Sequence, residues 1–177
     1  MTTNGSSSLP RKSALWLVPL FLLVHNLEEA LLMPRFLPLD PARFPAALRP
    51  LVPDVRYEQF LPALVIFTLL PFIVAALGKL DVRGSRSVFI LLVIQAVMLV
   101  NVASHLGSAF LLGGYSPGLV TALLLNLPFS IYLFRQAAAE EWISRRALLS
   151  LPLAAVLVHG PLLIGLFVVS GWLANAG

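Results

Sequence analysis

Near its start the chain carries three ionisable side chains at helical spacing, His25, Glu28 and Glu29. Residues three and four positions apart lie on the same face of an α-helix, so these side chains would point into one arc. Imidazole and carboxylate groups in such an arc can bind a divalent metal ion or pass a proton between them. Asn101 and His105 repeat the spacing of four residues and predict a second polar helix face.

The composition places these groups in apolar surroundings. Of the 177 residues, 59% are hydrophobic and 11% are charged, whereas a soluble domain has about 25% charged residues. This composition excludes a soluble monomer and a disordered chain. The absence of cysteine excludes disulfides, thiolate metal sites and cysteine nucleophiles. We interpret the net charge of +4 as membrane topology and predict no nucleic-acid partner, and nothing in the sequence indicates a nucleotide or haem.

Five apolar segments are long enough, or nearly so, to cross a hydrocarbon core, which takes about 20 helical residues. Each must be a helix in lipid, because an unpaired backbone amide there costs several kcal/mol. We therefore predict an all-α polytopic membrane helix bundle with about five transmembrane helices, forming a single domain over 14–177. Residues 1–13 are expected to be a disordered cytoplasmic tail. The predicted spans are 14–33, 60–77, 88–112, 117–134 and 149–174.

Arginine and lysine predict the direction of the spans. Eight of the twelve basic residues precede the first span or lie in the loops after the second and fourth spans. The other four are arginines of the loop 34–59, whose six prolines exclude one regular helix. The positive-inside rule then puts the N-terminus in the cytoplasm and the C-terminus on the extracytoplasmic side. We predict an integral protein of the bacterial plasma membrane that contacts membrane lipid. The sequence does not specify its oligomeric state.

All three histidines of the chain lie inside predicted spans. An ionisable side chain at mid-bilayer costs at least about 2.5–3.5 kcal/mol, so each is a candidate functional residue. At a rise of about 1.5 Å per residue, the polar side chains of several spans fall in the outer half of the membrane, with His159 nearest the middle. We predict one polar chamber that opens toward the extracytoplasmic side. Its members are His25, Glu28, Glu29, Asn101, His105, Thr121, Asn126 and His159.

The run from His25 to Glu29 has the pattern H-x-x-E-E. Asn101-x-x-x-His105, Tyr115-x-Pro117-Gly118-x-x-Thr121-Ala122 and Pro128 follow it in order. In these features the chain resembles the HXXEE family of small integral membrane proteins. The resemblance implies a membrane protein whose histidines and glutamates bind metal, and it brings no established reaction.

The leading hypothesis is a membrane-embedded, metal-dependent enzyme that acts on a small lipophilic substrate. Two histidines and a carboxylate form a usual ligand set for zinc, iron or manganese. We expect His25, His105 and Glu29 as ligands and Glu28 as a further ligand or general base. His159 would add a third imidazole if the last span bends at Pro161. Residues expected to support the bound group are Asn101, Thr121 and Asn126.

Other functions remain open for the same residues. A bound zinc ion would activate water for hydrolysis, and iron would support oxidation. Without metal, Glu28 or Glu29 beside His25 would act as an acid–base pair in an isomerase or cyclase. An ion, proton or small-molecule transporter could use the same groups as a relay, and a structural polar lock needs no ligand. We interpret 115–118 as a turn, and Glu140 and Glu141 as solvated.

Overall fold

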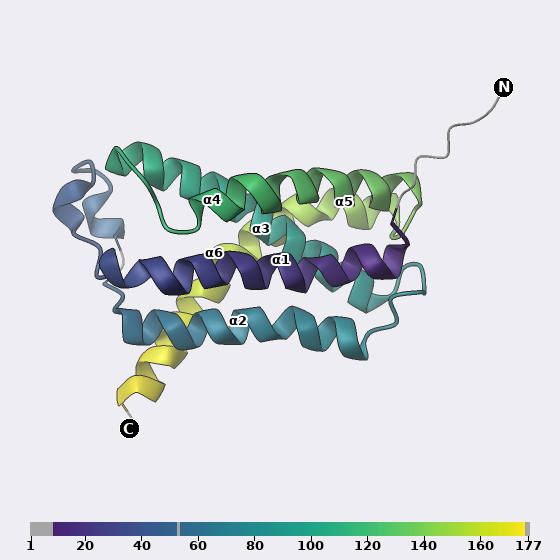
Figure 1. Ribbon diagram of the computed structural model, residues 1–177, viewed down its shortest axis with the longest axis horizontal. Coiled ribbons are helices and arrows are strands. Elements are labelled where there is room, and N and C mark those ends of the chain that lie inside the picture. Colours follow the sequence, from purple (N-terminus) through teal and green to yellow (C-terminus); the bar gives the residue numbers. More distant parts are fainter. Residues whose placement is uncertain (1–8, 53, 176–177) are drawn as a thin grey trace.

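The computed structural model describes residues 9–52 and 54–175, with the side chains of α6 described as far as Gly160. The described residues hold helices and no strand. Figure 1 shows α1 between α2 on one side and α4 and α5 on the other, with α3 and α6 behind. Helix α6 crosses the bundle obliquely and packs against α2 and α3. The α-helices are α1 (Arg11–Leu32), α2 (Tyr57–Leu77), α3 (Arg86–Leu112), α4 (Leu119–Thr121), α5 (Leu127–Ala139) and α6 (Arg145–Asn175).

Within the part of the chain that the structure describes, four segments are long and apolar enough to cross a membrane: Arg11–Arg35, Tyr57–Leu77, Arg86–Leu112 and Leu119–Ala139. Helix α6, the predicted fifth span, has 31 residues, more than the roughly 20 that a bilayer core requires. The prediction of an all-α bundle is therefore confirmed. Its boundaries need correction, because residues 11–13 belong to α1 and not to the tail. Residues 1–8 of the predicted tail lie outside the described part of the chain.

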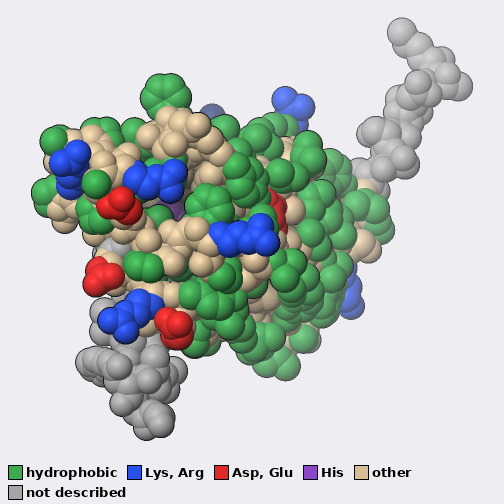
Figure 2. All heavy atoms as spheres, turned by 60° about the vertical axis from the view of Figure 1, so that its left-hand side comes forward, with side chains coloured by type: hydrophobic (Ala, Val, Ile, Leu, Met, Phe, Trp, Pro, Cys, Tyr) green, Lys and Arg blue, Asp and Glu red, His purple; other side chains and the backbone are tan. Residues whose placement is uncertain are grey.

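Large apolar side chains cover the outside of the bundle as well as its core. Leu77 and Phe110, for example, are 83% and 87% exposed. In Figure 2 apolar side chains cover most of the visible face, and charged ones gather toward the end that carries the first loop. Exposed apolar surface of this extent is compatible with an integral membrane protein. Fully buried core residues include Leu15, Leu22, Leu91, Leu92 and Trp142.

The fourth span is not a regular α-helix. Residues Ala122–Asn126 form a π-helix, labelled η4, between α4 and α5. Pro128 follows it, and proline has no N–H to give to the carbonyl four residues earlier and crowds that carbonyl. A wider π turn relieves this conflict, and such turns are frequent at functional sites. Thr121 and Asn126, both predicted site residues, lie at the two ends of this turn.

Contacts between distant segments define the end of the bundle that carries most basic residues. The Arg11 guanidinium donates to the carbonyl oxygens of Leu80, at 3.0 Å, and Asp81. The Gly84 amide donates to the Trp142 carbonyl at 2.8 Å. The start of α1 therefore lies beside the loops after α2 and after α5. The predicted grouping of basic residues agrees with this arrangement, while the orientation in the membrane stays a prediction.

Glu140 is not simply solvated. Its carboxylate accepts hydrogen bonds from Gln136, at 2.7 Å, and from the indole of the fully buried Trp142, at 2.9 Å. The prediction of two solvated glutamates is therefore wrong for Glu140. Glu141 is exposed and lies 3.9 Å from the Arg83 guanidinium.

The first loop contains three short 3-10 helices, η1 (Met33–Arg35), η2 (Pro41–Arg43) and η3 (Arg49–Leu51). The expectation that its prolines prevent one regular helix is thus confirmed for the described part of the loop. At the loop's end, the Tyr57 hydroxyl donates to the Ala30 carbonyl at 2.8 Å. This bond fixes the start of α2 against the end of α1.

Candidate functional site

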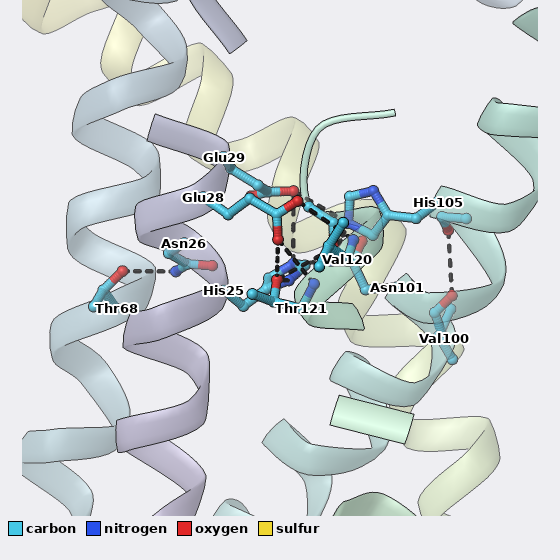
Figure 3. A network of polar contacts seen from close by, with 12 residues as sticks. His25, Asn26, Glu28, Glu29, Thr68, Val100, Asn101, His105, Val120 and Thr121 are labelled. Carbon is cyan, nitrogen blue, oxygen red and sulfur yellow. Dashed lines mark hydrogen bonds and ion pairs between the residues drawn. The ribbon is translucent and has the colours of Figure 1, made fainter. Parts of the chain in front are cut away.

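Three buried side chains from two helices converge inside the bundle. His25 and Glu29 lie one turn apart on α1, and His105 reaches them from α3. Glu29 Oε1 is 3.6 Å from His25 Nε2 and 3.2 Å from His105 Nε2. One ligand atom from each residue lies within 4.8 Å of the other two. We call these three residues the His/Glu cluster; Figure 3 shows it in place.

The spacing of the His/Glu cluster suits a common metal ion. Two ligands at about 2.0–2.1 Å from a tetrahedral zinc ion lie roughly 3.4 Å from each other. The two separations from Glu29, 3.2 and 3.6 Å, bracket that value. Two imidazoles and a carboxylate also suit iron and manganese. The donor set and its geometry therefore fit a bound divalent cation.

Thr121 determines which nitrogen of His25 faces the cluster. Thr121 Oγ1 lies 2.8 Å from His25 Nδ1 and 2.6 Å from Glu28 Oε2. The carboxylate can only accept, so the threonine hydroxyl donates to Glu28 and accepts from His25 Nδ1–H. The hydroxyl could instead donate to the Gly118 carbonyl at 3.3 Å, and it would then still accept its hydrogen bond from His25 Nδ1–H. His25 Nε2 is then unprotonated, and its lone pair points toward Glu29 and His105, as a metal ligand requires.

Glu28 lies beside the His/Glu cluster (Figure 3) and directs its carboxylate at the start of α4. Besides the Thr121 hydroxyl, its carboxylate accepts the backbone amides of Thr121, at 2.8 Å, and Val120, at 3.3 Å. The Tyr115 hydroxyl donates to it as well. A carboxylate here satisfies amides that the first turn of a helix leaves without partners. The structure thus places Glu28 as a cap of the fourth span and not among the converging ligand atoms.

Tyr115 lies outside the spans, in the turn after α3. Partial burial and the Glu28 carboxylate raise the pKa of its hydroxyl to about 12. The hydroxyl therefore keeps its proton at neutral pH and remains a donor to Glu28. This contact fastens the turn to α1.

Asn101 bridges the two imidazoles. Its side-chain nitrogen Nδ2 is 2.9 Å from His25 Nε2 and 3.0 Å from His105 Nε2. A carboxamide has two N–H groups, so one can point to each ring. Asn101 thereby aligns both Nε2 atoms toward the same point. Turning the carboxamide over would present its oxygen there instead.

Gly118 closes the His/Glu cluster on one side. Its φ of +87° is in the left-handed region. A Cβ atom on it would lie 2.7 Å from His105 Cε1 and 2.9 Å from His25 Cε1. Only glycine therefore fits, and the turn before α4 packs directly on both imidazoles. The interpretation of 115–118 as a turn was incomplete, since this turn also covers the cluster.

Two further predicted site residues lie apart from the His/Glu cluster. Asn126 is buried in the π-helix, and its side-chain nitrogen and oxygen have no hydrogen-bond partner among the described residues. Its backbone carbonyl accepts from Ser130 at 2.6 Å. His159 is half-buried and lines the same cavity as Glu29 and His105, but it is not one of the converging ligands. The predicted bend at Pro161 falls on a side chain outside the described part.

A cavity of about 530 Å³ adjoins the His/Glu cluster. Glu29 and His105 form part of its wall, and Asn26 lines it from α1. The Asn26 amide also donates to the Thr68 hydroxyl of α2 at 2.6 Å (Figure 3). The side chains lining the cavity are those of Asn26, Glu29, Met33, Phe60, Ala63, Leu64, Phe67, Val97, Met98, Asn101, Ser104, His105, Ser108, Ser116 and His159.

The fold and the site define a class of protein: a bundle of apolar, membrane-length helices with an internal His/Glu cluster beside a cavity. The family of proteins of unknown function with an HXXEE motif matches residues 16–133. The chain belongs to this family, as its motifs indicated. The matched part contains the whole His/Glu cluster and Gly118, whereas His159 lies beyond it. Neither the comparison with curated proteins nor that with solved structures found a match.

Proposed function

We propose that the protein is a membrane-embedded, metal-dependent enzyme that acts on a small lipophilic substrate. The observation that carries this proposal is the convergence of His25, Glu29 and His105 beside the cavity. Two imidazole nitrogens and a carboxylate oxygen that face one another in a buried site favour a positive charge between them. A divalent cation would supply that charge, and His25, Glu29 and His105 would be the residues that hold it.

The tautomer of His25 favours the metal over a shared proton. Its proton lies on Nδ1, bonded to Thr121 and directed away from Glu29. A bound ion would coordinate the Nε2 lone pairs that the Asn101 side chain now contacts. The Asn101 carboxamide would therefore have to turn over or move away. Zinc at this site would activate water for hydrolysis, and iron or manganese would support an oxidation. The His/Glu cluster would hold the ion, Thr121 and Asn101 orient the imidazoles, and Gly118 packs against both rings.

Metal-free acid–base catalysis is the second candidate. With the Asn101 carboxamide turned over, so that its oxygen faces the rings, His105 Nε2–H could donate to Glu29 Oε1 across the 3.2 Å that separates them. Such a pair could pass a proton to or from a substrate in the cavity, as an isomerase or cyclase requires.

Elemental analysis of detergent-purified protein separates the two candidates. We expect about one zinc, iron or manganese ion per chain after purification with these metals. His25→Ala and Glu29→Gln should lose the ion, whereas Glu141→Gln, an exposed glutamate at the far end, should keep it. A wild-type chain that takes up no metal under these conditions would rule out the metal-dependent enzyme and leave acid–base catalysis.

We also propose that the protein lies in a bacterial plasma membrane with its N-terminus in the cytoplasm and its C-terminus outside. The support is the excess of basic residues at one end of the bundle. A reporter fused after Gly177 should be active only on the extracytoplasmic side, and activity in the cytoplasm would reverse this topology.

A further inference from the structure

A second pocket lies where the loop after α2, the end of α5 and the start of α6 meet. This is the end of the bundle opposite the first loop (Figure 1). The pocket has a volume of about 680 Å³ and shares no lining residue with the cavity beside the His/Glu cluster. It is therefore a separate site, and nothing said above about metal or substrate applies to it.

The ionisable side chains of this second pocket are Arg83, Arg145 and Glu141. Two positive charges and one negative charge leave its lining with a net charge of +1. Glu141 neutralises Arg83 only weakly, because the two groups are 3.9 Å apart and both side chains are largely exposed. The ion pairs found in the described part of the chain do not include Arg145. The planar guanidinium group matches the geometry of a phosphate, so the pocket favours a phosphate-bearing anion.

An apolar surface continues from the second pocket along α6. Arg145, Leu149 and Leu153 follow one another at intervals of four residues and so lie on one face of the helix. Leu149 and Leu153 are 70% and 64% exposed, and the exposed Val156 extends the same face. Leu148 brings apolar surface into the pocket itself. A ligand held by Arg145 would thus have its charged group in the pocket and an uncovered apolar stripe next to it.

We propose that the second pocket binds the phosphate group of a membrane lipid that carries one net negative charge. Arg83 and Arg145 hold the phosphate, and an acyl chain of the lipid lies along Leu149 and Leu153. The single negative charge balances the net charge of the lining. Basic pockets between helices at one end of a membrane bundle are typical binding sites for anionic headgroups. A soluble phosphate compound would use the arginines and leave the apolar stripe bare.

Non-denaturing mass spectrometry of the full-length protein in detergent tests this proposal by measuring how tightly each ligand binds. The ligands are dioleoyl phosphatidylglycerol, dioleoyl phosphatidylcholine, whose phosphate is accompanied by a cation, and glycerophosphoglycerol, which is the first headgroup without acyl chains. We expect phosphatidylglycerol to bind at least about fivefold more tightly than phosphatidylcholine, the effect of one charge near a membrane surface. Equal binding of the two lipids would overturn the proposal. Glycerophosphoglycerol that binds as tightly as phosphatidylglycerol would overturn it too, in favour of a soluble phosphate compound.

Three arginine variants distinguish a site from general surface charge. Arg83→Gln and Arg145→Gln should each weaken phosphatidylglycerol binding about fivefold. Arg146→Gln is the matched control, because Arg146 adjoins Arg145 on α6 but does not line the pocket. It should bind the lipid like wild type. All three side chains are exposed, so the variants should fold. An equal loss of binding in all three would mean that the lipid responds to surface charge alone, and the proposed site would be wrong.

Glu141→Gln tests the sign of the charge that the second pocket receives. The variant leaves both arginines and removes the negative charge of the lining, so it should bind phosphatidylglycerol more tightly than wild type does. Weaker binding would mean that Glu141 contacts a cationic group of the ligand, and this outcome would overturn the assignment of an anionic lipid.

Discussion

Replacing Thr121 by valine tests the link between Glu28 and the His/Glu cluster. Valine has nearly the shape of threonine but cannot accept the hydrogen bond from His25 Nδ1 or donate to Glu28. The other donors to Glu28, two backbone amides and the Tyr115 hydroxyl, remain. The variant therefore removes one node of the hydrogen-bond chain and leaves the cap of the fourth span largely in place.

We expect Thr121→Val to weaken metal binding about 10- to 100-fold, the usual effect of losing the group that orients a ligating histidine. The physical reason is that His25 is fully buried and its Nδ1–H would lose its acceptor, at a cost of roughly 1–3 kcal/mol. The ring can recover that cost by changing tautomer or rotating, and either change turns its lone pair away from Glu29. A tenfold loss of affinity corresponds to about 1.4 kcal/mol, so the two estimates agree.

The assay is competition between the purified protein and a chelator of known affinity, with Thr121→Ser as the control. Serine keeps the hydroxyl, so this variant should bind metal within about threefold of wild type. Thermal unfolding of the metal-free proteins measures any loss of stability separately. If Thr121→Val and Thr121→Ser bind metal equally well, Thr121 does not orient His25 and the assignment of the tautomer is wrong.

Three further changes test other parts of the site. Gly118→Ala should abolish metal binding and lower the unfolding temperature, because its Cβ would lie 2.7 Å from His105; Gly107→Ala, with no atom within 4 Å of the new Cβ, should do neither. Spectrophotometric titration should give a Tyr115 pKa of about 12, absent in Tyr115→Phe and lower in Glu28→Gln. Because this pKa is raised on folding, its contribution to stability is complete below pH 10 and is lost as pH rises through about 12. If the unfolding temperature of Tyr115→Phe falls as much as that of the wild type over the same pH range, Tyr115 is not the group responsible. Asn126→Leu should leave metal content unchanged and raise the free energy of unfolding by about 1–3 kcal/mol, since an unpartnered buried polar group is removed; loss of metal in this variant would return Asn126 to the site.

The helices could be predicted from the sequence because their apolar runs have the length of a bilayer. The start of α1 was predicted too late, since Arg11 and Lys12 have the composition of a solvated tail. Their helical conformation depends on partners that the local sequence does not reveal. Arg11 donates to a carbonyl 69 residues away, and Lys12 lies 3.8 Å from the Asp81 carboxylate.

The pairing of His25 with Glu29 was predictable because a spacing of four residues on one helix fixes it. The closeness of His105 followed from its depth in the third span. The role of Gly118 was not predictable, because neither its φ of +87° nor its approach to two imidazoles is visible in a Pro-Gly pair. The π-helix was missed for a related reason, since a proline inside a span indicates some adjustment without specifying which.

Glu28 and Glu29 are neighbours in sequence, and the helix itself divides their tasks. Successive residues of an α-helix point about 100° apart, because one turn takes about 3.6 residues. With Glu29 directed at His105 on α3, Glu28 must face the adjoining element, which is the start of α4. There it accepts hydrogen bonds from four donors, which stabilise its charge without a cation. Among the described residues, the Glu29 carboxylate lies within 4 Å of two imidazole nitrogens, those of His25 and His105, and a neutral imidazole nitrogen of this kind is itself an electron-pair donor. The two neighbouring carboxylates of α1 are therefore not equivalent: Glu28 caps the fourth span, and Glu29 is the carboxylate that faces both imidazoles of the His/Glu cluster.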